Sequence, residues 1–406
     1  MDPTTTAIGT WSGGRFMHFG EPLEDERLRA LVRPGDGIDT VITADAYGAG
    51  EADSLLGAAL RGVDRDAYCL IGAIGHDFYK GAREGAKGYP RFTDARLRGP
   101  EAYADYIRMA TERSLERLRV QRLDVLLLHN PDRTGYTSEA VWEGMAAVRD
   151  AGLTRMLGVA PGPANGFTLD VIDCIERYGE LLDWAMLILS PLEPWPGELA
   201  LGAAEANGVK VITRVVDYGG VFHDDVKPGH EFADWDHRKF RPAGWVERGN
   251  EKLERMRPYA QRHDLSMLQL ACQWNLAHEA VRCVAPTLIQ EARTSPGARG
   301  EESRVGRGAP PRARGEENGV GRGAPREIEE KRAELAALPP VPLLSEAEIR
   351  ELRAIGDNTG SMALKGANAT YAGEPAADRW ALSEELNEVA ARWEIAPERD
   401  LAMASN

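Results

Sequence analysis

Residues 39–48, DTVITADAYG, hold a short apolar run that ends on a tyrosine, Tyr47. Residues 123–132, LDVLLLHNPD, hold a second apolar run, which ends on a histidine, His129. Apolar runs of this length and composition are typical of buried strands. In a barrel of parallel strands, the catalytic groups follow the C-terminal ends of the strands. The two stretches therefore predict a parallel sheet with proton-handling side chains at one of its ends.

Short apolar runs alternate with amphipathic stretches along most of the chain, which is typical of repeated βα units. Strands are predicted at 7–11, 39–44, 68–73, 123–128, 155–159, 184–189, 209–216 and 281–288. Helices are predicted at 51–60, 101–118, 138–151, 168–178, 198–206 and 250–277, and further on at 327–338, 345–355 and 379–393. The pattern predicts an α/β protein, a (β/α)8 TIM barrel with additional C-terminal helices; an open doubly wound sheet is the alternative.

A tandem repeat interrupts this pattern, because residues 298–310 and 313–325 share the motif ARGEExxVGRGAP. Its arginine, glycine, proline and glutamate content predicts a disordered surface insertion. The alternative is that its arginines bind an anion. We predict a barrel over residues 1–356, interrupted by the insertion at about 292–326, and a C-terminal helical extension over 357–406.

Composition and charge narrow the functional class. The chain has 64 acidic and 49 basic residues, which argues against nucleic-acid binding. No apolar run approaches the ~20 residues that cross a bilayer, and no secretory segment is visible at the N-terminus. The cysteines are scattered, so we expect reduced thiols in a cytoplasmic protein; they are Cys69, Cys174, Cys272 and Cys283. The oligomeric state stays open.

Both opening stretches resemble the aldo-keto reductase family, whose second strand ends in Asp-Thr-Ala-x-x-Tyr-Gly and whose fourth ends in His-x-Pro-Asp. The likeness extends over roughly residues 5–356, with the repeat set aside. It also includes Gly9-Thr10-Trp11-x-Gly13-Gly14, Gly158-Val159 and the run from Asn250 through Ser266-x-x-Gln269 to Trp274. The resemblance implies NADP(H)-linked reduction or oxidation of a small carbonyl or alcohol. Tyr47 is then the proton donor, and His129 orients the substrate.

The resemblance also implies that two members of the family's four-residue site are missing. The position of the family's catalytic aspartate reads Ile42, and that of its lysine reads Ala73. A free phenol has a pKa near ~10, and the family uses these two neighbours to lower it. Possible replacements are His76, Lys80 and, with a longer loop, Asp39.

Cofactor and substrate contacts follow from the same resemblance. It implies that Thr10, Trp11, Ser190 and Arg214 contact the nicotinamide cofactor, and that Trp11, His76 and Asn130 contact the substrate. Several of the family's cofactor positions differ here and read Ala160-Pro161, Met186, Arg214-Val215-Val216, Ala285-Pro286-Thr287 and Glu330-Lys331. No GxGxxG fingerprint follows a strand, so a Rossmann-type site is not predicted.

The segment after the seventh predicted strand is rich in histidine and aspartate: His223, Asp224, Asp225, His230, Asp234, Asp236 and His237. These residues lack the fixed spacing of a zinc site, and we expect no metal. We expect this segment, with Trp235 and Trp245, to form part of the pocket wall.

Two other functions remain open from the residues alone. One is a non-redox lyase, dehydratase or isomerase that keeps Tyr47 and His129 for proton transfer. The other is a non-catalytic, ligand-binding barrel. These two functions are favoured by Ile42, Ala73 and the altered cofactor positions. The family likeness favours the reductase.

Overall fold

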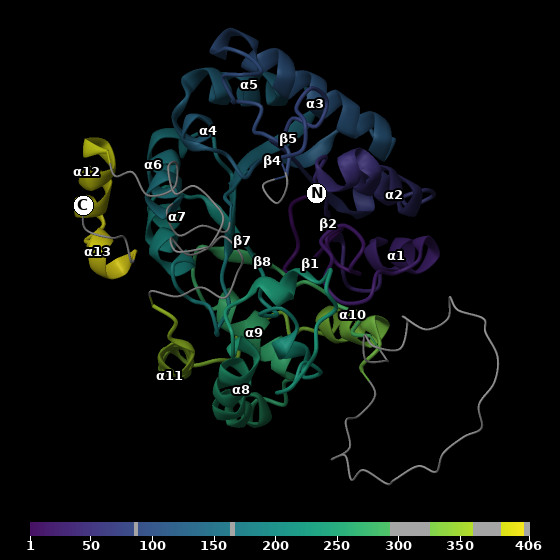
Figure 1. Cartoon of the computed structure of the whole chain (residues 1–406), viewed down its shortest axis with the longest axis vertical. Coiled ribbons are helices and arrows are strands. Elements are labelled where there is room, and N and C mark those ends of the chain that lie inside the picture. The colour runs from purple at the N-terminus through teal and green to yellow at the C-terminus, as the bar shows by residue number, and fades with distance from the viewer. Residues whose placement is uncertain (85–87, 163–166, 293–324, 360–382, 402–406) are drawn as a thin grey trace, which may run out of the picture.

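The computed structural model describes residues 1–84, 88–162, 167–292, 325–359 and 383–401 (Figure 1). Eight parallel strands form one sheet in chain order. They are β1 (Ala7–Gly9), β2 (Thr40–Ile42), β3 (Cys69–Ile74), β4 (Leu123–His129), β5 (Thr154–Ala160), β6 (Trp184–Ile188), β7 (Lys210–Arg214) and β8 (Val281–Ala285). A parallel bridge between Thr6 and Val284 joins the last strand to the first. The sheet is therefore a closed barrel, as the sequence predicts, and not an open sheet.

Helices surround the strands (Figure 1). The α-helices are α1 (Asp25–Val32), α2 (Glu51–Ala59), α3 (Tyr103–Leu118), α4 (Arg133–Thr137), α5 (Glu139–Asp150), α6 (Thr168–Tyr178), α7 (Leu201–Ala206), α8 (Trp245–Arg262), α9 (Met267–Leu276), α10 (Ile328–Ala336), α11 (Glu346–Gly356), α12 (Glu384–Arg392) and α13 (Pro397–Asp400). Short 3₁₀ segments are η1 (Tyr47–Gly50), η2 (Arg65–Ala67), η4 (Pro100–Ala102), η6 (Gly197–Ala200), η7 (Val221–His223) and η8 (His237–Phe240).

One predicted helix is wrong, because residues 250–277 form two helices, α8 and α9. Asp264 takes a left-handed φ of 53°, which ends the first helix. Ser266 then caps α9 through a capping box with Gln269. Helices α1 and α4 were not predicted at all.

Two apolar layers hold the barrel together. One lies between strands and helices, and the other fills the barrel interior. Alternation along β2 sends Val41 to the outer layer and Ile42 to the interior. Tyr47 packs against the interior layer, which therefore supports the residues that follow the C-terminal ends of the strands.

The C-terminal helices lie against the outside of the barrel, and α12 and α13 are beside α6 (Figure 1). Arg392 and Trp393 both donate hydrogen bonds to Glu176 of α6. Most of the predicted insertion at 292–326 lies outside the described residues. The predicted boundary at residue 357 is close to another range, 360–382, that is not described. Both domain limits therefore stay predictions.

Candidate active site

Tyr47 and His129 meet at the C-terminal end of the barrel. Tyr47 begins η1 just after β2, and His129 is the last residue of β4. Their ring centroids are 5.7 Å apart and the rings are nearly perpendicular. The ring of His76, just beyond β3, lies 5.4 Å from that of His129 on centroids. The three rings predicted to act on a substrate therefore share one mouth.

Hydrogen bonds fix the orientation of His76. Its Nδ1 lies 2.8 Å from the carbonyl oxygen of Tyr89, which can only accept, so Nδ1 carries the proton. Nε2 then accepts from the side-chain amide of Asn130 at 3.3 Å. Arg91 donates from Nε to the Asn130 carbonyl oxygen at 2.9 Å. Asn130 and His76, both expected at the substrate, are thus in contact.

Arg214 brings a guanidinium to the same mouth. It is the last residue of β7, in register with Ile188 of β6 and Ala285 of β8. Its Nη2 donates to the Pro161 carbonyl oxygen at 2.9 Å. Among the described residues, no carboxylate forms an ion pair with it. Its charge is near enough to Tyr47 and His129 to shift the pKa of both.

The electrostatics of the mouth follow from burial and from these arginines. Burial raises the pKa of Tyr47, and the Arg214 guanidinium opposes that rise. Burial holds the pKa of His129 well below its usual value, and His76, Arg214 and Arg91 lower it further. Burial and Arg91 lower the pKa of His76 to about 4. Both imidazoles are therefore neutral at pH 7, and the charged groups acting on them are arginines.

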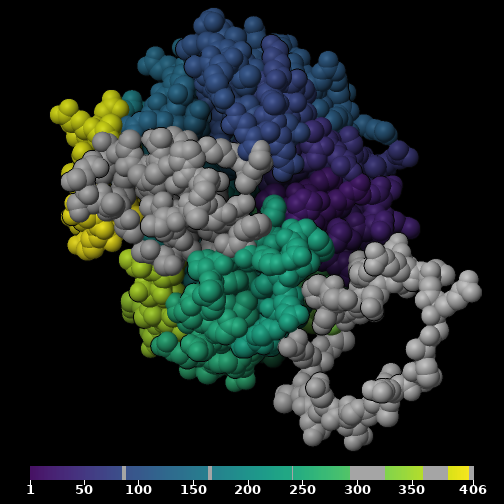
Figure 2. Space-filling view, in the orientation of Figure 1, coloured from purple at the N-terminus to yellow at the C-terminus, as the bar shows by residue number. Residues whose placement is uncertain are grey.

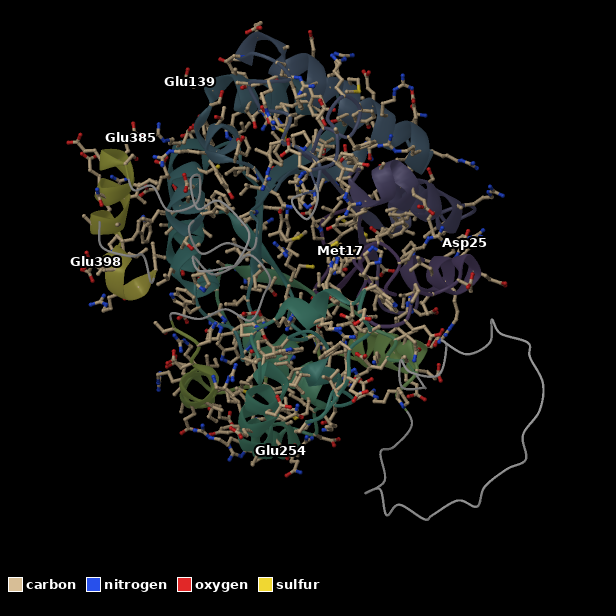
Figure 3. The ribbon with its side chains drawn as sticks, viewed as in Figure 1. Met17, Asp25, Glu139, Glu254, Glu385 and Glu398 are labelled. Atoms are coloured by element: carbon tan, nitrogen blue, oxygen red, sulfur yellow. The ribbon has the colours of Figure 1, made fainter. Side chains whose placement is uncertain are left out.

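An apolar wall lies beside these polar groups. The Trp11 ring packs over Gly9, where a Cβ would meet the ring at 2.3 Å. Met17 and Tyr47 pack against the same interior cluster as Trp11. Figure 3 shows Met17 near β1 and β2, while the labelled acidic residues lie around the outside of the barrel.

Ile42 and Ala73 belong to the interior cluster against which Tyr47 packs. At these two positions, β2 and β3 therefore offer hydrocarbon and no titratable group. Lys80 is exposed in the loop after β3. Asp39 precedes the first residue of β2, at the opposite end of the barrel, so the suggestion that it serves Tyr47 is wrong.

Thr10 and Ser190, expected at the cofactor, follow the ends of β1 and β6 and are both buried. The Thr10 hydroxyl donates to the hydroxyl oxygen of Thr43 at 3.4 Å. The Ser190 hydroxyl donates to the carbonyl oxygen of Val216 at 3.1 Å. Both hydroxyls therefore already have partners in the fold, and their role at a cofactor stays a prediction.

Charged side chains in the segment after β7 form ion pairs with other residues of the protein. Arg238 is fully buried and pairs with Asp236 and Glu291. Lys331 of α10, also fully buried, contacts Asp225 and the Ile289 carbonyl oxygen, each at 2.5 Å. In the part of the chain that the structure describes, no group of histidine, cysteine and acidic residues could hold a metal ion.

The same segment lies against the N-terminal segment, as green beside purple in Figure 2. The Gly20 N–H donates to Asp236 Oδ2 at 2.9 Å, and the His237 N–H donates to the His18 carbonyl oxygen. Of the two tryptophans expected at a pocket wall, Trp245 is buried, whereas 49% of Trp235 is exposed. That expectation is wrong for Trp235, which faces solvent.

Asp45 is a buried acidic residue near the mouth to which the sequence assigns no role. It is buried, and neither carboxylate oxygen has a hydrogen-bond partner. Burial raises its pKa well above the ordinary value, and the nearby Asp53 adds to the rise. An acidic residue between two alanines, just after an apolar run, is the signal that could have identified it.

All four cysteines are buried and free. None of the helices in the described ranges combines the length and apolar character needed to cross a membrane.

Comparisons with known proteins agree with this geometry. Residues 7–295 match the model of the aldo/keto reductase family. The chain is 23% identical over 303 residues to a probable voltage-gated potassium channel subunit beta of Arabidopsis thaliana, covering 70% of this chain and 85% of that one. It is 28% identical over 185 residues to the aldo-keto reductase YhdN of Bacillus subtilis, covering 45% and 49%. The glycerol dehydrogenase AKR11B4 of Gluconobacter oxydans has the same fold, with a TM-score of 0.58, 20% identity, and coverage of 91% and 93%.

Proposed function

Because the chain belongs to the aldo/keto reductase family, we propose that it is an NADP(H)-linked oxidoreductase that acts on a small carbonyl or alcohol. Family and fold support an oxidoreductase with a small-molecule substrate, and members of this family generally use NAD(P)H. The observation that carries the proposal is that the Tyr47 ring lies against a neutral imidazole, His129, and that the charge of the Arg214 guanidinium acts on its phenol.

Tyr47 acts as the proton donor in this proposal. Its phenol must be able to lose a proton near neutral pH, and burial alone makes that harder. The Arg214 charge favours the phenolate and so opposes the effect of burial. His129 is neutral, so it orients the carbonyl oxygen by hydrogen bonding without bringing a competing charge.

We propose that Ile42 and Ala73 stand where the family has its aspartate and lysine, and that Arg214 supplies the missing positive charge from β7. The supporting observation is that Ile42 and Ala73 lie in the interior cluster that contacts Tyr47. Arg214 is the only charged group whose effect on the pKa of Tyr47 is resolved among the described residues.

A nicotinamide ring fits the apolar wall at the mouth. Trp11 belongs to the interior apolar cluster, and Met17 and Tyr47 pack against it; a bound nicotinamide would supply the hydride. The residues at the β8 end fit the adenosine part less well, because Lys331 is committed to Asp225 and to the backbone of Ile289. We therefore assign the nicotinamide end of the site to Trp11 and Arg214.

Replacing Tyr47 by phenylalanine tests this function. Tyr47→Phe removes the proton donor and keeps the ring, so the rate of NADPH oxidation with a panel of small aldehydes and ketones falls about 10²- to 10⁴-fold. Tyr259→Phe is the matched control, because the Tyr259 hydroxyl contacts Glu351 on the outside of α8. Wild-type turnover in Tyr47→Phe excludes Tyr47 as the acid.

A further inference from the structure

A pocket of about 440 Å³ lies in the segment after β7, outside the mouth of the barrel. It is formed by residues 230–232, by part of η8 and the residues that follow it, and by the first turn of α8. Tyr47, His129 and Arg214 do not line it. Small-molecule sites measure roughly 300–1,000 Å³, so this pocket is large enough for a ligand of its own.

Arg241 lines this pocket, and only 7% of its surface is exposed. Its guanidinium carbon lies 4.4 Å from the centroid of the Trp245 ring, and its Nη1 donates to the Tyr218 carbonyl oxygen at 3.4 Å. Among the described residues, Arg241 makes no other hydrogen bond and no ion pair. Its remaining nitrogens are not sealed from solvent. Most of its five N–H donors are therefore available to a ligand in the pocket.

A buried guanidinium without an anion is costly, because it has lost hydration that nothing replaces. Arg238, in the same segment, shows the usual compensation, since it pairs with two carboxylates. For Arg241, the face of the Trp245 ring compensates only in part. Burial lowers the pKa of Arg241, and Glu193 and Asp217 offset part of that effect without pairing with it. The fold therefore keeps an incompletely compensated cation at the wall of a pocket.

The first turn of α8 lines the same pocket. The helix begins after Gly244 and has no side-chain cap. Among the described residues, the N–H groups of Val246 and Glu247 have no hydrogen-bond partner. The N-terminus of a helix is partly positive, and its free N–H groups favour an anion. Two elements of the fold therefore offer donors to one pocket.

The rim of the pocket carries charges of both signs. Glu231, Glu247 and Lys239 line it and are exposed, and Lys239 pairs with Asp234. Water and salt screen these exposed charges, whereas burial shields Arg241 from such screening. The acids of the rim therefore do not take the place of an anion at Arg241.

We propose that this pocket binds the phosphate group of a phosphorylated small molecule, with Arg241 and the first N–H groups of α8 as donors. A phosphate monoester carries a charge of about −1.5 to −2 and three acceptor oxygens, so it can accept from the guanidinium and from the helix together. A carboxylate has two oxygens in one plane, which a guanidinium satisfies by itself. The site lies outside the mouth, so the proposal does not depend on the reductase function.

A calorimetric titration of the full chain with phenyl phosphate, in a buffer free of phosphate, tests the site. Arg241→Met should weaken binding about 10- to 100-fold, as expected for a lost charge-assisted hydrogen bond. Ala243→Glu adds a carboxylate at an exposed position of the pocket wall, which repels the phosphate and should weaken binding as well. Arg113→Gln, on the exposed face of α3, is the control and binds as wild type does.

Thermal unfolding separates a binding role of Arg241 from a structural one. Phenyl phosphate should raise the Tm of wild type and of Arg113→Gln, but not that of Arg241→Met. If Arg241→Met does not fold, Ala243→Glu decides the question, because its position is exposed. Wild-type affinity for phenyl phosphate in Ala243→Glu or in folded Arg241→Met overturns the proposal, and so does absence of binding to wild type at millimolar concentrations.

Two further titrations identify the anion. Benzoate should bind at least about 10-fold more weakly than phenyl phosphate, because a carboxylate leaves the N–H groups of α8 without a partner. Equal binding of both that depends on Arg241 assigns the pocket to carboxylates and overturns the proposal. Phenyl phosphate should bind equally well with and without saturating NADPH. If NADPH displaces it and Arg241→Met weakens NADPH binding, the pocket belongs to the cofactor and the proposal is wrong.

Discussion

At the scale of single residues, the sequence predicts where Tyr47 and His129 lie in the mouth, but it does not predict the surroundings of Arg214. Tyr47 and His129 follow apolar runs, so their arrival at one end of the barrel follows from the strand-end rule. Arg214 was expected at a cofactor because of its place on the chain. Its lack of a carboxylate partner depends on which side chains surround it in the fold, and no local pattern encodes that.

Asp45 gives a prediction about stability and pH. Its pKa is raised in the folded protein, so the folded state binds more protons than the unfolded state above the ordinary pKa of about 4. Its contribution to the unfolding free energy therefore falls as pH rises through the folded pKa. Asp45→Asn has no proton to lose, so the variant should become more stable relative to wild type as pH rises from 4 to 7.

Urea unfolding at pH 4 and pH 7 checks this prediction. The unfolding free energy of Asp45→Asn should rise relative to that of wild type from pH 4 to pH 7. Asp105→Asn, at an exposed position of α3, is the control and should show no widening. A difference in unfolding free energy that stays constant or narrows means that partners in the folded protein stabilise the charged form of Asp45.

At the scale of elements, all eight strands lie where the apolar runs predict them, because strands buried on both faces read as continuous apolar segments. The break between α8 and α9 was missed although its signal is local. Ser266 and Gln269 have the spacing of a capping box, but an apolar period that continues across a cap hides it. The packing of the segment after β7 was not predictable, since two of its buried ion pairs, Arg238–Glu291 and Lys331–Asp225, join residues far apart in sequence.

A substitution of Arg238 tests whether ion pairs hold the segment after β7 in place. It joins Asp236, in the same segment, to Glu291 after β8. Burial would raise the pKa of Glu291, but the Arg238 guanidinium and His230 together outweigh burial and hold that pKa below its ordinary value. Arg238→Met takes the guanidinium away from two buried carboxylates, which keep, among the described residues, His230 at Glu291 and the backbone N–H groups of Gly20 and residue 238 at Asp236, and it should lower the unfolding free energy by about 3–5 kcal/mol in urea titrations.

The pH dependence of this loss has a definite sign. A carboxylate with a lowered pKa stabilises the folded state above its ordinary pKa, and the stabilisation disappears as pH falls through the folded value. The penalty of Arg238→Met should therefore be smaller in acid than at pH 7. A variant as stable as wild type at pH 7 would show that the ion pairs are not what holds the segment.

At the scale of the whole molecule, the barrel follows from the number and order of strands, and the comparisons confirm the family that the motifs resemble. The sequence could not place the C-terminal helices, because their contacts with α6 are side-chain contacts across more than 200 residues. The division of the chain at residues 292–326 and 357 stays a prediction.

Deleting residues 298–325 tests that division. The residues flanking the deletion are already joined, since the Ile328 N–H donates to Gln290 Oε1 at 3.0 Å and Gln290 Nε2 donates to the Arg326 carbonyl oxygen at 3.4 Å. The deletion should leave the Tm unchanged in calorimetry, because the composition of the repeat predicts a surface insertion that contributes nothing to the core. A fall of several degrees would show that the repeat is part of the folded structure.

The most direct test of the oxidoreductase account is a titration of the purified chain with NADPH and with NADH, followed by cofactor fluorescence and by heat. Trp11 and Arg214 at the mouth predict saturable binding of the nicotinamide cofactors in the micromolar range, and the comparison of the two titrations decides between NADPH and NADH. Absence of binding up to millimolar concentrations of either cofactor would contradict the account and leave Tyr47 and His129 without a hydride source.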